Sequence, residues 1–171
     1  VEVGKIHYEP FGIYPGTKAS LDEIADGDTI AVPNDTTNEA RALLLLQDNG
    51  IITLKDGAGL TATVNDIAEN PHNVKIEELA AESVARVADE VAYVVLNGNY
   101  ALDYGIDPST AIFKESEYDD DSYFCLMAVR SSDADDAVYK RIVELFQSET
   151  TKQIFQDEFN GYFVPAWEVQ K

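Results

Sequence analysis

The chain is 171 residues long and 45% of them are hydrophobic, which is enough to bury a core in one or two compact units. Its formal net charge is −20, with only 12 lysines and arginines, so it repels phosphates and is not expected to bind nucleic acid or anionic lipid surfaces. No apolar stretch approaches the roughly 20 residues needed to cross a bilayer. We expect the chain itself to be soluble and any export signal to lie outside it.

The first half of the chain alternates between strand and helix patterns. The predicted elements are a strand over residues 1–14, a short helix that Ser20 caps, a strand over 29–32, a helix from 36 or 37 that ends at Asn49 and Gly50, a helix over 63–69 and a strand over 74–77. The helix that contains residues 39–47 is the most secure of these, because strong helix formers fill it.

The second half continues the alternation. Its predicted elements are a helix over residues 83–89, a buried strand over 91–96, a strand over 123–129, and helices over 135–146 and 149–159. Strands that alternate with helices predict an α/β fold with a mainly parallel sheet. The sequence contains no internal repeat and no low-complexity linker.

The most informative stretch is the strand over residues 30–32, which turns through polar residues into a helix that carries Arg41 in its first turn. A helix start presents unpaired N–H groups and a positive dipole end, and a guanidinium there can hold a carboxylate through two parallel hydrogen bonds. In the alternative interpretation, Thr37 or Asn38 only caps the helix and Arg41 pairs with a surface glutamate. Taken alone, the stretch favours this alternative.

A second polar stretch follows the buried strand over residues 91–96, where Asn97, Gly98 and Asn99 come next. Open α/β sheets bind ligands beyond the carboxyl ends of their strands, so amides at this position are placed to accept from an ammonium. Asn-Gly is also a common turn, which is the simpler interpretation. Together, the two strand ends suit the two poles of an amino acid, with Arg41 on the carboxylate and Asn97 as a polar partner.

The other reactive residue types do not form a recognisable catalytic or metal motif. Neither His7 nor His72 belongs to a metal-ligand pair, so we predict no metal site and no cofactor. Cys125 lies in an apolar run and is predicted to be a small buried residue without a histidine partner. An enzyme that uses paired carboxylates or Cys125 would need titratable groups that converge in one cleft, and the candidate site offers amides and one arginine instead. We therefore expect no enzymatic activity.

Five stretches are informative in combination: HYEPFGIY at residues 7–14, IAVPNDTTNEARALLLLQ at 30–47, LKDG at 54–57, DIAENP at 66–71 and NGNYA at 97–101. Together they resemble the signature of the NlpA/MetQ family of methionine-binding lipoproteins, almost from Val1 to Trp167. The resemblance implies an α/β fold of the type II periplasmic-binding-protein kind, with two lobes. One complete lobe would run over residues 16–112, while 1–15 and 113–171 would belong to a second lobe, which is incomplete because the N-terminal third of a family member is absent.

The resemblance also implies a function. Members bind methionine or a closely related amino acid or dipeptide for an ABC importer, whose permease and ATPase are their partners, and a lipid anchors them outside the cytoplasm. Carried onto this chain, the ligand-binding residues are Arg41, Asn97 and Asn38. A surface-exposed interaction or adhesion module that keeps the receptor fold without transport is the alternative. The incomplete lobe would expose the edges of its strands, and we expect a second copy of the chain to pair with them.

Overall fold

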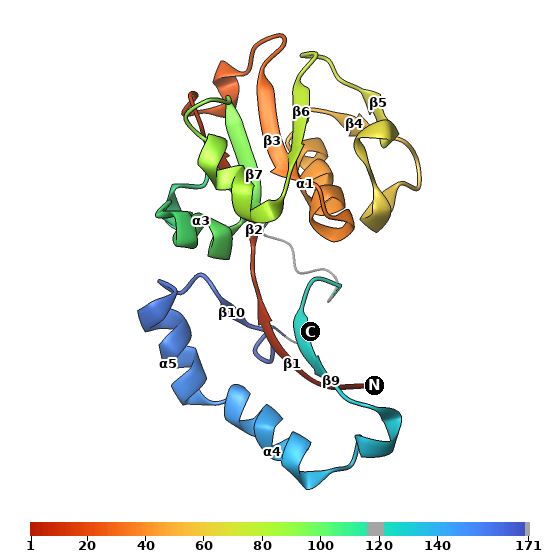
Figure 1. Cartoon of the computed structure of the whole chain (residues 1–171), viewed down its shortest axis with the longest axis vertical. Coiled ribbons are helices and arrows are strands. Elements are labelled where there is room, and N and C mark those ends of the chain that lie inside the picture. The colour runs from red at the N-terminus through yellow and green to blue at the C-terminus, as the bar shows by residue number, and fades with distance from the viewer. Residues whose placement is uncertain (116–121, 170–171) are drawn as a thin grey trace. The chain divides into compact units, whose positions relative to one another are not determined.

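A computed structural model of the chain describes residues 1–115 and 122–169. The chain forms two compact units, which are described separately (Figure 1). The central unit is Phe11–Glu115, and the terminal unit combines Val1–Pro10 with Ser116–Lys171. The lobe boundaries expected from the resemblance, 15/16 and 112/113, lie within a few residues of these divisions. The assignment of the two units to lobes stays a prediction.

The central unit is built on a five-stranded sheet in the order β6-β3-β7-β2-β8. The strands are β2 (Phe11–Pro15), β3 (Thr29–Pro33), β6 (Lys75–Leu79), β7 (Tyr93–Asn97) and β8 (Phe113–Lys114). β3 runs parallel to β6 and β7, whereas β2 runs antiparallel to β7 and β8. The sheet is therefore mixed instead of mainly parallel as predicted, because β2 lies between β7 and β8 and runs antiparallel to both.

Helices cover both faces of this sheet (Figure 1). The helices are α1 (Thr36–Asp48), α2 (Ala81–Val84) and α3 (Gly98–Tyr104). Because side chains alternate along a strand, Ile30 and Val32 of β3 pack with the buried residues of α1, while Ala31 packs with those of α2 and α3. The strand over 29–32 and the helix from 36 are thus confirmed, with both faces of the sheet buried.

Small elements complete the central unit. They are the 3₁₀ helices Leu21–Glu23, Gly59–Thr61, Val64–Asp66, Ala85–Val87 and Pro108–Thr110, and the two-stranded sheet of β4 (Thr53–Leu54) and β5 (Ile67–Glu69). The helix predicted over 63–69 is wrong, because only one 3₁₀ turn forms before Ile67 pairs with Leu54 in the β4–β5 sheet. The turn expected at 97–99 is also wrong: Asn97 stands at the N-terminal cap of α3.

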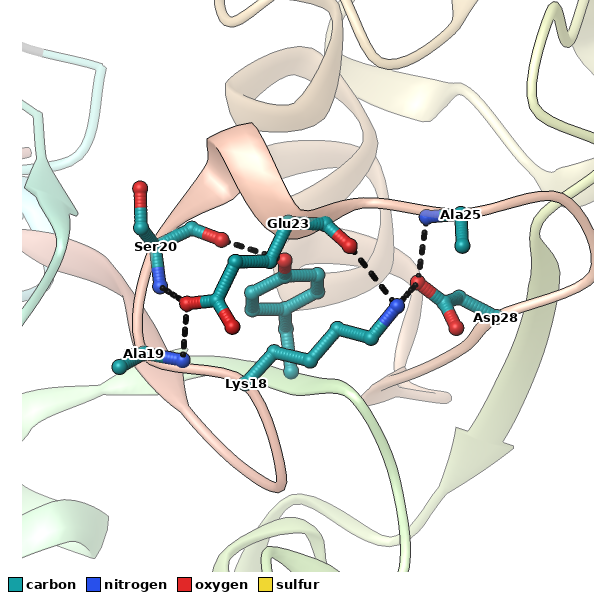
Figure 2. A network of polar contacts seen from close by, with 7 residues as sticks. Lys18, Ala19, Ser20, Glu23, Ala25 and Asp28 are labelled. Carbon is teal, nitrogen blue, oxygen red and sulfur yellow. Dashed lines mark hydrogen bonds and ion pairs between the residues drawn. The ribbon is translucent and has the colours of Figure 1, made fainter.

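A polar network holds the segment between β2 and β3 (Figure 2). Lys18 Nζ donates to Asp28 Oδ2 at 2.5 Å and to the carbonyl of Glu23 at 2.8 Å. The side chain of Glu23 accepts from the N–H of Ser20, which completes the capping box predicted there. The hydroxyl of Tyr93 on β7 donates to the carbonyl of Ser20 at 2.7 Å, so the network is joined to the central sheet.

The terminal unit contains an antiparallel sheet in the order β10-β1-β9. Its elements are β1 (Glu2–Tyr8), β9 (Cys125–Ala128), the 3₁₀ helix Ser131–Asp133, α4 (Ala137–Phe146), α5 (Glu149–Glu158) and β10 (Val164–Pro165). The single strand predicted over 1–14 is divided, because β1 and β2 belong to different sheets and Glu9 and Pro10 separate them. Pro10 lacks the N–H that a continuous ladder would need.

Cys125 differs from its prediction as well. Its side chain is exposed, and the residue lies directly opposite His7 in the register of β1 and β9. The apolar run predicted a buried residue, but within the described residues β9 pairs with a neighbour only on its β1 side and is largely exposed. Cys125 is therefore neither buried nor without a histidine neighbour.

Candidate functional site

The start of α1 is fixed by Asp35, which precedes the helix. Its Oδ1 accepts from the backbone N–H of Asn38 at 3.1 Å, and its Oδ2 accepts from Asn38 Nδ2 at 3.0 Å. Asp35 is therefore the capping residue, rather than Thr37 or Asn38 as the alternative interpretation proposed. Asn38 Oδ1 points the other way and accepts from Asn97 Nδ2 at 3.4 Å. This contact joins two of the three predicted site residues.

Arg41 lies one turn further along α1 and only 5% of it is exposed. Its guanidinium forms a two-point ion pair with Glu115, with Nε to Oε1 at 2.7 Å and Nη2 to Oε2 at 2.5 Å. The same guanidinium lies 5.0 Å from the centre of the Phe11 ring. The surface ion pair of the alternative interpretation is thus incorrect, because the partner is a mostly buried carboxylate.

Phe11 connects Arg41 with the end of β7. It lies opposite Asn97 in the register of β2 and β7, and its N–H donates to Glu115 Oε2 at 3.0 Å. Phe11 therefore contacts the Arg41 guanidinium through its ring and the Glu115 carboxylate through its backbone N–H. It also pairs with β7 at Asn97. The structure brings Arg41, Asn38 and Asn97 together around Phe11 within the central unit.

Two side-chain amide oxygens, one at the end of β7 and one in the first turn of α3, are buried without a hydrogen-bond donor. Within the described residues, Asn97 Oδ1 and Asn99 Oδ1 accept no hydrogen bond. A buried polar atom that lacks a partner costs about 1 to 3 kcal/mol, so such atoms are uncommon and call for an explanation. Each of these oxygens could accept from an N–H donor.

Glu39, which neighbours Asn38, has a structural contact instead. Its buried side chain accepts from the N–H of Val64 at 3.0 Å, which ties α1 to the 3₁₀ turn at Val64–Asp66. Burial raises the pKa of Glu39, and the hydrogen bond from Val64 opposes that rise. Glu39 thus anchors α1 to this 3₁₀ turn.

The side chains of Arg41 and Asn97 together suit a ligand that carries a carboxylate and an ammonium. A guanidinium that already holds a carboxylate in two parallel hydrogen bonds is a carboxylate-binding group, and an unpaired amide oxygen nearby is suited to an ammonium. Sequence reasoning named Arg41, Asn38 and Asn97 as candidate site residues and placed Asn99 beside Asn97, but it missed Phe11 and Glu115. Phe11 and Asn99 belong to motifs read from the sequence, whereas Glu115 follows no pattern and is 74 residues from Arg41.

The chain has the α/β fold of periplasmic substrate-binding proteins. It is similar to the solved structure of a nutrient-binding protein from Burkholderia cenocepacia bound to methionine, with 42% identity, a TM-score of 0.87, and coverage of 97% of this chain and 70% of that chain. The substrate-binding protein of a methionine transporter from Streptococcus pneumoniae gives 29% identity and a TM-score of 0.88, with 98% and 68% coverage. A lipoprotein from Ruminococcus gnavus gives 56% identity and a TM-score of 0.86, with 96% and 69% coverage.

The family follows from the sequence comparison. The sequence model described as NlpA lipoprotein matches residues 1–167, and the chain belongs to this family. The D-methionine-binding lipoprotein MetQ of Escherichia coli O157:H7 is 41% identical over 170 residues, which are 98% of this chain and 62% of that protein. The chain thus spans less than two thirds of the length of this relative. Among the described residues, no helix has the length and apolar character to span a membrane.

Proposed function

We propose that the chain is part of the substrate-binding component of an ABC importer, and that it binds methionine or a closely related amino acid or dipeptide. The observation that carries this proposal is the fork between Arg41 and Glu115 beside the unpaired oxygen of Asn97. A free amino acid has a carboxylate that the Arg41 guanidinium can bind and an ammonium that can donate to Asn97 Oδ1. The names of the relatives support methionine as the amino acid.

Glu115 has a specific place in this proposal. Its carboxylate occupies the Nε and Nη2 donors of Arg41. A ligand carboxylate that binds this same edge of the guanidinium would exchange with Glu115 instead of adding to it. The protein thereby keeps a buried cation paired when no ligand is bound.

The proposal extends to location and partners. The relatives are named as lipoproteins, which supports an extracytoplasmic protein held at the membrane by a lipid. The partners would be the permease and ATPase of the importer. The assignment of residues 16–112 to one lobe, and of 1–15 and 113–171 to the other, is part of the same proposal. Nothing in this mechanism makes or breaks a covalent bond.

Titration of the chain with each of the twenty amino acids, followed by nuclear magnetic resonance, tests the proposal. Methionine is expected to shift the side-chain signals of Arg41 Nε–H and of the Asn97 amide, with a Kd of about 1 mM, or about −4 kcal/mol. Weak binding is expected, because the chain spans 62% of the length of the Escherichia coli O157:H7 relative. In Asn97→Ala the shifts at Arg41 should require a markedly higher methionine concentration.

A matched control is Asn73→Ala, which changes an exposed asparagine of the same unit that bonds to Asp26 and lies outside the site. This variant should bind methionine as the unchanged chain does. Identical small shifts for all amino acids, spread over the surface, would contradict the proposal. A submicromolar affinity would instead show that the chain holds a complete site.

A further inference from the structure

Three potential metal ligands come together in the terminal unit, whereas Arg41 and Asn97 belong to the central unit. Ligand atoms of His7, Glu9 and Cys125 all lie within 4.8 Å of one another. His7 Nε2 is 2.9 Å from Glu9 Oε1. The function proposed above uses none of these side chains.

The backbone explains why these three side chains meet. Residues i and i+2 of an extended chain point to the same face, which places the side chains of His7 and Glu9 together. Directly opposite residues of antiparallel strands have their Cβ atoms about 5 Å apart, and Cys125 of β9 is the partner of His7 in β1. The cluster is thus a product of strand register, and not of a flexible loop.

Aromatic side chains fix the orientation of the histidine. The ring of His7 stacks on Phe163 with centroids 4.6 Å apart, and Phe155 approaches it edge-on at 5.9 Å. His7 and Glu9 are mostly buried, at 20% and 16% side-chain exposure, whereas Cys125 is exposed. An imidazole held between two rings has lost most of its freedom before a ligand arrives, which favours binding.

The ligand types select the ion. Thiolate and imidazole together favour zinc over the oxygen-seeking cations magnesium and calcium, and carboxylate is also an accepted zinc ligand. Zinc bonds of about 2.0 to 2.3 Å require ligand atoms about 3.3 to 3.8 Å apart in a tetrahedron. The cluster is within small side-chain rotations of that spacing, since its ligand atoms all lie within 4.8 Å of one another.

We propose that His7, Glu9 and Cys125 form a binding site for one zinc ion per chain, with the fourth position open to water. Three protein ligands leave one position of a tetrahedral zinc ion open, in contrast to closed structural sites with four protein ligands. The thiol of Cys125 loses its proton when it binds the metal.

Titration of the reduced, chelator-treated chain with zinc chloride at mildly alkaline pH, followed by calorimetry, tests the site. One equivalent of zinc is expected to bind, and Cys125→Ser and His7→Ala should each weaken binding about tenfold or more. Cobalt chloride serves as a coloured probe: the unchanged chain should develop a sulfur-to-cobalt absorption band in the near ultraviolet. That band should vanish in Cys125→Ser and diminish when zinc is added.

The matched control is His72→Ala, which removes the other histidine and should leave both titrations unchanged. Because Cys125 is exposed, Cys125→Ser is expected to keep the far-ultraviolet circular dichroism of the unchanged chain, which separates loss of a ligand from loss of fold. With 32 acidic residues, the chain is also expected to bind divalent cations loosely. Weak binding at several equivalents, without a sulfur-to-cobalt band and unaltered by Cys125→Ser, would overturn the proposal. So would one zinc per two chains.

Discussion

Arg41 combines a fork onto Glu115 with a stack over Phe11, so its side chain serves both packing and charge. Breaking an ion pair from one side leaves the other charge buried and unpaired. Only 15% of the Glu115 side chain is exposed, and it cannot regain full hydration without moving. Substitutions on the two sides of this pair therefore have different expected consequences.

Replacing Arg41 with alanine is expected to abolish measurable binding of methionine, through a loss of about 2 to 5 kcal/mol. The same change should lower the free energy of unfolding by about 2 kcal/mol or more, because Glu115 loses its partner. Calorimetry and urea denaturation measure the two effects. Arg86→Ala removes an exposed arginine of the same unit and should alter neither. Unchanged affinity in Arg41→Ala would mean that the ligand carboxylate binds elsewhere.

The Glu115→Gln variant tests whether Glu115 competes with the ligand for Arg41 or helps to bind the ligand. A glutamine keeps an oxygen for the N–H of Phe11 but removes the negative charge that occupies Arg41. If the ligand exchanges with Glu115, this variant should bind methionine about tenfold more tightly, a gain of about 1.4 kcal/mol. The titration used for the unchanged chain measures this. Weaker binding would instead indicate that Glu115 contacts the ammonium of the ligand.

At the scale of elements, the segment between β2 and β3 depends on a lysine and an aspartate (Figure 2). The hydrogen bond from Lys18 is the largest of the effects that lower the pKa of Asp28; the N–H of Ala25 also lowers it, while burial opposes both. An acid whose pKa is lower in the folded state stabilises the fold above its unfolded pKa of about 3.9. That stabilisation is lost as the pH falls through the folded pKa.

Lys18→Met is therefore expected to lower the free energy of unfolding by about 1 kcal/mol at neutral pH, where Asp28 is charged. The difference between the variant and the unchanged chain should shrink below pH 4, as Asp28 takes up a proton in both. Thermal unfolding across this pH range measures it. Lys75→Met, at an exposed lysine of β6, is the matched control. A difference that stays constant with pH would mean that Lys18 acts through packing alone.

Local patterns predicted the elements on which the site is built, since the strand before Pro33 and the helix after Asp35 carry strong propensity and capping signals. The proximity of Arg41 and Asn97 followed from the rule that neighbouring strand ends share one edge of a sheet. Local sequence patterns failed to predict secondary structure where tertiary contacts determine it. Gly98 and Asn99 look like a turn but begin α3, and residues 67–69 look helical but pair with β4.

Glu115 and Cys125 were unpredictable for a related reason. Glu115 meets Arg41 across 74 residues of sequence, and no local spacing encodes that contact. Cys125 meets His7 through the register of β1 and β9, and a shift of one residue would put Cys125 on the opposite face. The candidate site residues that follow the two strand ends could be predicted from the sequence, whereas contacts that join distant segments could not.

At the scale of the whole molecule, the terminal unit exposes apolar side chains. Leu126 of β9 is 46% exposed, and Val138 and Phe146 of α4 are 64% and 45% exposed. Exposed apolar groups and unpaired strand edges can associate with another copy of the chain, so the pairing of two copies stays a prediction.

Light scattering should therefore show a mean mass above that of one chain, rising with concentration. Val138→Lys is expected to shift the chain toward the monomer, because it places a charge on the apolar face of α4. Val1→Lys, at an exposed residue outside the elements, is the control and should have less effect. A monomer at high concentration in all three proteins would defeat this prediction.

The chain passes between its two units at Pro10–Phe11 and again at Glu115–Ser116. Glu115 holds the N–H of Phe11, so one carboxylate fastens both passages together. The backbone N–H of Glu115 also donates to the carbonyl of Phe11 at 3.0 Å. A small molecule that takes the guanidinium of Arg41 from Glu115 would therefore act directly on the residues at which the chain enters and leaves the central unit.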